Sequence, residues 1–199
     1  MPSRWDILPM HLGIIGLIGA IAVTGLSTWK VFVFPSDSPD VTEELWEGLW
    51  ITCHKYSELQ VDCKPYDLDH DLTPELKASR WLMCFSIGVI VVALIITGSL
   101  FHETFSFCDT EKNKNVILAV GGILFWVSVL TLLIPVSWGR HSINGSDNGV
   151  DSQKWERGSA IYIGWASSAF LFLAGAILLI RWSNSVLLQS HSLDQRKGR

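Results

Sequence analysis

The chain has 199 residues, of which 49% are hydrophobic and only 17% are charged. Its mean hydropathy of +0.32 is higher than is usual for a soluble domain with a charged surface. A net charge of −4 with no basic stripe excludes the usual type of nucleic-acid-binding protein, so we expect no nucleic-acid partner. Several of the ten tryptophans lie near the ends of apolar runs, where indole rings favour the headgroup layer of a membrane. These are Trp5, Trp29, Trp81, Trp138 and Trp182.

Four apolar runs are each close to the roughly 20 residues that a helix needs to cross hydrocarbon. They cover about residues 8–28, 81–101, 116–136 and 160–180, and none contains Asp, Glu, Lys or Arg. A soluble bundle would show polar faces at helical spacing, which these runs lack. We therefore predict a membrane α-helical protein with four spans. The first run is alternatively a cleaved signal peptide, but its length and the lack of a clear cleavage site favour a helix.

Small residues recur within the apolar runs. Gly13, Gly16 and Gly19 are spaced by three in the first run, and Gly121 and Gly122 are adjacent in the third. Because small residues let membrane helices approach closely, we interpret them as packing positions.

The orientation of the chain follows from its loops. The distribution of Lys and Arg in the short segments that flank the spans only weakly favours cytoplasmic termini. A disulfide between Cys53 and Cys63 needs an oxidising compartment, and Asn144 begins an Asn-Gly-Ser glycosylation sequon. Both features place the first and third loops, residues 29–80 and 139–159, outside the cell. Residues 181–199 are then a cytoplasmic tail, and residues 1–199 form a single domain at the plasma membrane.

The first loop is large enough for a fold of its own. Residues 29–34 are aromatic and β-branched and predict a strand, and residues 41–56 predict one or two more. The Cys53–Cys63 pair is spaced to join a hairpin. Thr73 before Pro74 indicates a helix start that leads into the second span. The third loop, rich in Gly, Ser and Asn, has room for one strand at most.

The order of these features resembles the claudin family, and the resemblance covers nearly the whole chain. It is carried by Trp29, the Gly48-Leu49-Trp50 segment, Cys53, Cys63, Arg80, residues 134–138 and residues 162–166. Peripheral-myelin-type proteins and calcium-channel gamma subunits share the tryptophan and cysteine pattern. Arg80 together with the Pro-Val-Ser-Trp segment favours claudins, and the chain resembles a somewhat divergent member of that family.

The resemblance implies a left-handed four-helix transmembrane bundle carrying an extracellular antiparallel β-sheet of about five strands. It also implies a cell–cell adhesion protein of tight junctions. Such proteins contact claudins side by side in one membrane and across to the next cell, and form a paracellular barrier or a charge-selective channel. We expect no enzyme activity and no cofactor or metal, because no motif pairs a nucleophile, a base or a metal cluster. A transporter is disfavoured, because His11 is the only ionisable residue within a span.

The charges of the first loop predict conflicting ion preferences. Residues 30–80 contain eleven acids against five bases, an excess that attracts cations. Lys64, however, follows the second cysteine, a position that often sets selectivity in the family, and a base there resembles barrier or anion-preferring members. The candidate selectivity residues are Lys64, Asp62, Asp67 and Glu47. The alternative is that most of these charges only solvate the loop.

This chain departs from the family at its side-to-side contacts. Relatives place apolar residues where this chain has Asp69 and His70, and a charge in an apolar pocket is costly. The candidate contact residues are Leu68, Asp69, His70 and Trp155. The alternative function is therefore a non-polymerising auxiliary subunit or organiser of another membrane protein.

Two further expectations concern the cytoplasmic side. Residues 194–199 lack the hydrophobic end that a PDZ scaffold binds, so such a partner is not expected. Cys108, in the loop after the second span, is a candidate for palmitoylation or else an unmodified thiol.

Overall fold

The structure is a computed structural model that describes residues 4–34, 43–57, 60–66, 73–100, 111–144 and 154–197. Contacts divide the chain into two compact units, which are described separately. The first unit comprises Met1–Leu17, Ser86–Leu130 and Ser167–Arg199. The second comprises Ile18–Phe85 and Thr131–Ala166 and contains the sheet.

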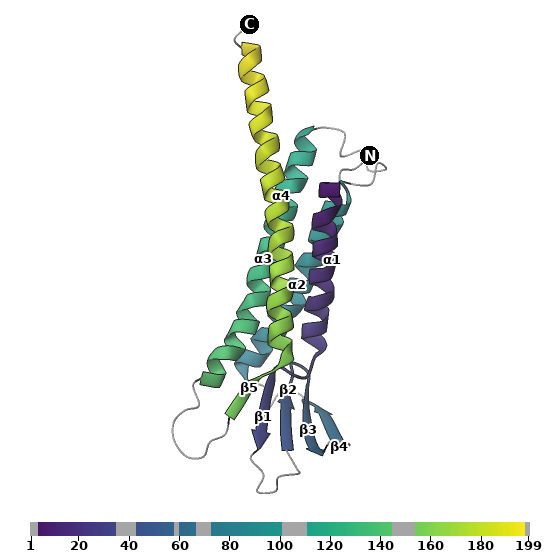
Figure 1. The fold of residues 1–199 in the computed structure, drawn as a ribbon, viewed down its shortest axis with the longest axis vertical. Helices are drawn as coiled ribbons and strands as arrows, with labels where there is room; N and C mark the ends of the chain where they lie inside the picture. The colour runs from purple at the N-terminus through teal and green to yellow at the C-terminus, as the bar shows by residue number, and fades with distance from the viewer. Residues whose placement is uncertain are drawn as a thin grey trace. The chain divides into compact units, whose positions relative to one another are not determined.

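In the described part of the chain four helices are long and apolar enough to cross a membrane (Figure 1). They are α1 (Arg4–Gly25), α2 (Pro74–Gly98), α3 (Glu111–Asn144) and α4 (Ser159–Lys197). This confirms the four predicted spans, although the helices are longer than the apolar runs. As expected from Thr73, α2 begins with Pro74 at its first position, and the Leu76 N–H donates to the Thr73 carbonyl at 3.0 Å.

The helices α3 and α4 extend beyond the runs from which they were predicted. We expected the third span to end near residue 136, and the stretch of α3 that is apolar enough to cross a membrane ends at Ser137, although the helix itself continues through Pro135 to Asn144. We expected the fourth span to end at residue 180, but α4 continues to Lys197. Residues 182 and 186–188 of this extension are Trp, Val and two Leu, good to moderate helix formers with no internal Pro or Gly to stop the helix.

In the first unit the helices pack through small residues, as the glycine spacing predicted. A Cβ on Gly13 would lie 2.8 Å from Leu94, and one on Gly16 would lie 2.6 Å from Leu171. The Ser86 hydroxyl of α2 donates to the Ser128 carbonyl of α3 at 3.0 Å, which satisfies a buried polar group across the interface.

Much of the helix surface outside these contacts is apolar. Large aliphatic side chains are more than half exposed in both units, among them Ile18, Ile95, Leu130 and Ile180. Such surface is unfavourable in water and favourable in lipid, so the chain is a multi-pass membrane protein.

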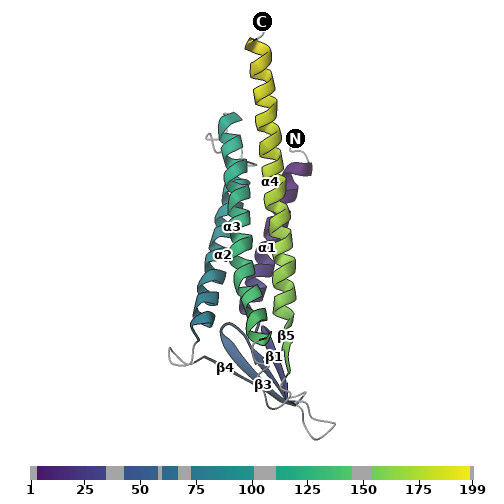
Figure 2. The ribbon, with the colours of Figure 1, turned by 90° about the vertical axis from the view of Figure 1, so that its left-hand side faces the viewer.

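The second unit contains a five-stranded antiparallel sheet in the order β4-β3-β2-β1-β5 (Figure 1). The strands are β1 (Lys30–Phe34), β2 (Glu43–Glu47), β3 (Ile51–Ser57), β4 (Gln60–Pro65) and β5 (Lys154–Arg157). This confirms the expectation of about five strands, with β2 and β3 arising from the segment 41–56. Figures 1 and 2 show β5, from the third loop, beside β1, where Phe32 pairs with Trp155.

Candidate functional site

The turn between β2 and β3 is formed by Gly48, Leu49 and Trp50. The Gly48 N–H donates to the Ile51 carbonyl at 3.0 Å, and Leu49 is only 1% exposed. A Cβ on Gly48 would lie 2.6 Å from the Ser27 Cα, and this backbone atom cannot move aside as a flexible side chain could. A glycine is therefore required for the close approach that buries Leu49.

Arg80, near the start of α2, holds this turn. Its Nε–H donates to the Leu49 carbonyl at 2.7 Å. Its guanidinium carbon lies 4.9 Å from the centre of the Trp50 ring and 5.5 Å from that of Tyr66. One planar cation thus satisfies a backbone acceptor and stacks on two aromatic faces. The structure places Arg80 beside the Gly-Leu-Trp segment, from which it is 30 residues distant in sequence.

Trp29 anchors the base of the sheet. The residue is only 7% exposed, and its indole N–H donates to the Val23 carbonyl of α1 at 2.8 Å. Its backbone N–H donates to the Glu47 carbonyl at 3.1 Å, and its carbonyl accepts from the Gly158 N–H at 3.3 Å. Trp29 therefore ties the end of α1 to β2 and to the residue before α4.

The predicted disulfide between Cys53 and Cys63 is present, and it joins directly paired residues of β3 and β4. The Cα atoms are 4.0 Å apart, and Cys53 is buried. A cross-link over a loop of this size stabilises a domain by about 2–4 kcal/mol, since it restricts the unfolded chain. It secures β4, an edge strand whose residues are all exposed.

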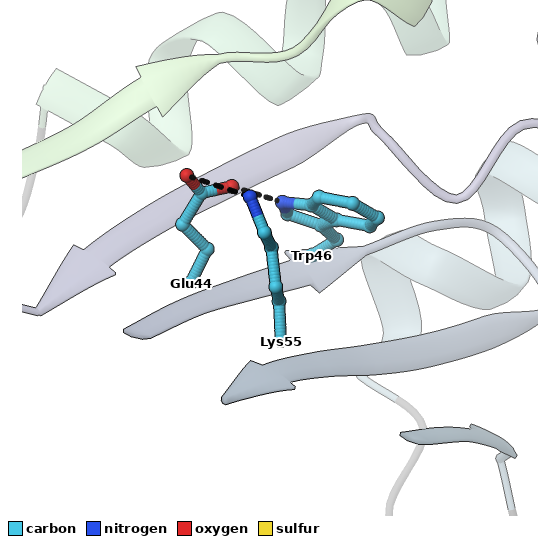
Figure 3. Close-up of polar contacts among 3 residues, drawn as sticks. All are labelled: Glu44, Trp46 and Lys55. Carbon is cyan, nitrogen blue, oxygen red and sulfur yellow. Dashed lines mark hydrogen bonds and ion pairs between the residues drawn. The ribbon is translucent and has the colours of Figure 1, made fainter. Parts of the chain in front are cut away.

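One face of the sheet carries a polar cluster of Glu44, Trp46 and Lys55 (Figure 3). The Trp46 indole N–H donates to Glu44 Oε2 at 2.8 Å, and Lys55 Nζ lies 3.8 Å from Glu44 Oε1. The Lys55 and Glu44 side chains are 22% and 24% exposed. Sequence reasoning counted Glu44 and Lys55 only as loop charges, because the cross-strand register that pairs them is not visible in the sequence.

The opposite face carries two of the candidate selectivity residues. Lys64 Nζ lies 3.5 Å from Asp62 Oδ2, with side chains 80% and 56% exposed. His54 pairs with Asp62 across β3 and β4, and its ring is stacked at 5.9 Å on that of Tyr56. The structure thus places Lys64 beside an acid, and it adds His54, which sequence reasoning did not single out.

Glu47, the third candidate, lies at the base of the sheet. It lines a hollow of about 170 Å³ together with Lys30, Tyr66 and the first residues of α2. Burial raises the pKa of Tyr66, and the nearby Glu47 carboxylate raises it further, whereas a Thr52 hydrogen bond and the Arg80 charge act in the opposite direction. The neutral phenol donates to the Gly48 carbonyl at 3.3 Å. Glu47 is therefore a partly enclosed charge beside the Arg80 contacts.

The model of the PMP-22/EMP/MP20/Claudin family matches residues 6–178, nearly the whole chain. The chain belongs to this family. Among curated relatives, it is 36% identical to claudin-17 of Sus scrofa over 176 residues, which cover 87% of this chain and 78% of the relative. It is 38% identical to claudin-8 of Mus musculus over 170 residues (83% and 75%) and 35% identical to claudin-3 of Homo sapiens over 184 residues (89% and 82%).

Most of the remaining candidate residues lie outside the part of the chain that the structure describes. The structure does not describe Asp67, Leu68, Asp69, His70 or Cys108. Of the other two, Trp155 occupies the β5 position paired with Phe32, and Asn144 is the last residue of α3. The roles expected of these residues remain predictions.

Proposed function

We propose that this chain is a claudin-like adhesion protein of tight junctions that forms a paracellular barrier or a charge-selective paracellular channel. The observation that carries the proposal is the disulfide-locked, five-stranded sheet held by Arg80, in a chain with claudin relatives at 35–38% identity. Four spanning helices supply the anchor that such a sheet needs to project from a cell surface. Membership of this family points to a structural or channel role rather than to catalysis.

Exposed charge on the sheet supports a role in ion selection. Asp62 and Lys64 lie on one exposed face, where mobile ions meet fixed charges within about one Debye length, roughly 8–10 Å. Selection of this kind needs no covalent chemistry, since it depends on the sign and spacing of charges along the path. The partners implied are membrane lipid, further copies of this chain and other claudins, beside it and on the facing cell.

The test is expression in cells that lack junction strands. We expect intramembrane strands at cell contacts by freeze-fracture, and a changed transepithelial resistance in monolayers that already form junctions. The matched control is Cys53→Ser, which removes the β3–β4 cross-link and leaves the spans unchanged. Normal surface delivery of the unaltered chain without strands or any change in resistance would refute the proposal.

A second candidate function is that of a non-polymerising auxiliary subunit or organiser of another membrane protein. The sequence observation in its favour is Asp69 and His70, where relatives place the apolar residues of the side-to-side contact. Under this alternative the unaltered chain forms no strands, Asp69→Leu promotes them, and a channel or receptor co-purifies in fixed stoichiometry. Strand formation by the unaltered chain excludes it.

A further inference from the structure

A hollow lies at the base of the sheet, on the side where α2 begins. Strands β1 and β2 contribute Lys30 and Glu47 to its lining, and α2 contributes Glu75, Leu76 and Ser79. Its volume of about 170 Å³ is below the roughly 300–1,000 Å³ of a pocket for a drug-sized ligand, but it exceeds the share of several water molecules in the liquid, at about 30 Å³ each. The hollow therefore has room for a compact polar group of several non-hydrogen atoms.

The lining of this hollow combines apolar surface with carboxylates. Trp29, Leu49 and Pro135 supply apolar walls. Glu47 of β2 and Glu75 in the first turn of α2 supply two negative charges from different elements. A bound group with a positive end and some hydrocarbon would match both features.

The hollow also has positive charge, which comes from the sheet. Lys30 lines it, and the strand register pairs Lys30 with Glu47 on β2 and with Arg157 on β5. The guanidinium carbon of Arg80 lies 5.5 Å from the centre of the Tyr66 ring, which is another part of the lining. A simple anion would meet the carboxylates and a simple cation would meet the lysine, so a ligand that carries both signs is the better match.

The position of the hollow along the helices indicates which ligands can reach it. The segments that are long and apolar enough to cross a membrane begin at Pro74 in α2 and end at Ser137 in α3. Glu75 and Pro135, which line the hollow, therefore lie at the ends of these two spans. Trp81, further along α2, is 78% exposed, as is typical of an indole ring in the headgroup layer. The hollow thus lies at the depth of the lipid headgroups.

We propose that this hollow binds the headgroup of a zwitterionic phospholipid, with the ammonium beside Glu47 and Glu75 and the phosphate beside Lys30. Carboxylates attract an ammonium and a lysine attracts a phosphate, and partial enclosure strengthens both interactions. The apolar walls accommodate the short carbon chain that joins the two charges. The acyl chains remain in the bilayer, so the bound lipid ties the base of the sheet to the membrane. The proposal does not depend on a paracellular function, because it concerns lipid binding by a single copy of the chain.

The experiment counts bound lipids by native mass spectrometry. The full chain is purified in maltoside micelles that contain equal amounts of phosphatidylcholine, phosphatidylethanolamine and phosphatidylglycerol. We expect phosphatidylcholine or phosphatidylethanolamine to be retained about fivefold more than phosphatidylglycerol, which has the phosphate but no ammonium, because one partly exposed ion pair supplies a factor of this size. Glu75→Gln removes one carboxylate at constant size, and Ser79→Leu fills the hollow without changing its charge. Either variant should lower the retention of the zwitterionic lipid to that of phosphatidylglycerol.

Glu43→Gln is the matched control, because Glu43 lies at the other end of β2 from Glu47, and it should retain lipid as the unaltered chain does. If Glu75→Gln does not fold, Ser79→Leu decides the matter. Equal retention of the three lipids by the unaltered chain, an unchanged preference in Ser79→Leu, or the same loss in Glu43→Gln overturns the inference. None of these outcomes bears on the paracellular function, since binding is measured on the purified protein.

Discussion

Arg80 shows what a single side chain contributes to the sheet. The guanidinium donates to the Leu49 carbonyl and faces the rings of Trp50 and Tyr66, so its loss leaves a backbone acceptor without its partner and two aromatic faces without their cation. We expect Arg80→Ala to lower stability by about 1–3 kcal/mol. The measurement is the thermal midpoint of the protein in detergent, followed by tryptophan fluorescence.

Arg80→Lys is the informative comparison for this prediction. Lysine keeps the charge but lacks the planar fork that bonds and stacks at once, so an intermediate midpoint is expected. Equal midpoints for Arg80→Ala and the unaltered chain would show that the turn is held by other contacts.

Tyr66 gives the sheet a dependence on alkaline pH. Its pKa is raised above the usual 10.0, chiefly by burial, so the folded state favours the neutral phenol. That contribution is fully present below pH 10.0 and is lost as the pH rises through the higher folded value. As the pH rises from 10.0 towards the higher pKa of the folded state, the thermal midpoint of the unaltered chain should therefore fall more steeply than the midpoint of Tyr66→Phe.

Tyr56→Phe is the matched control, because this tyrosine lies on the same sheet and is 46% exposed. Its alkaline profile should follow that of the unaltered chain. If Tyr56→Phe rather than Tyr66→Phe flattens the profile, the assignment to Tyr66 is wrong.

At the scale of whole elements, α3 and α4 pack closely against each other in the first unit. A Cβ on Gly175 would lie 2.6 Å from Trp126 and 3.0 Å from the Gly122 carbonyl, so each helix meets the backbone of the other. Trp126 is in turn stacked on Phe172, with ring centres 5.5 Å apart. We expect Gly175→Ala to destabilise the protein by about 1–3 kcal/mol, since a close-packed crossing has no room for a methyl group.

Gly88→Ala is the control for this crossing, because a Cβ there would meet nothing within 4 Å. Thermal unfolding followed by circular dichroism compares the two variants. A midpoint for Gly175→Ala equal to that of Gly88→Ala would mean that the crossing adjusts without strain.

At the scale of the whole molecule, the proposed orientation places both termini in the cytoplasm and the sheet outside. We expect epitope tags at either terminus to be labelled only after cells are permeabilised. A tag inserted between residues 35 and 42, in the connection between β1 and β2, should be labelled on intact cells. Labelling of a terminal tag on intact cells would show that the orientation is the opposite one. The sheet would then face the cytoplasm, where a disulfide is not expected to persist.

The sequence alone was sufficient for the class of protein and for the elements that carry strong local signals. Four uninterrupted apolar runs predict four helices, because a bilayer leaves few other ways to satisfy the backbone. The capping signal at Thr73 and Pro74, the β-branched strand at residues 30–34 and the Cys53–Cys63 pair were likewise local enough to predict. The apolar runs did not predict where the helices end, since α3 and α4 continue beyond them, and the part of α4 after residue 180 includes good to moderate helix formers.

Only the tertiary structure decided which charges act together. The pairing of Glu44 with Lys55, the position of His54 opposite Asp62 and the contact of Arg80 with Leu49 all depend on strand register or on the docking of a distant helix. A shift of one residue in the register would move every side chain to the other face, and no local pattern in these mixed strands specifies it. The sequence therefore determined a disulfide-stapled sheet and four membrane helices, while the folded register determined the face on which each charge lies.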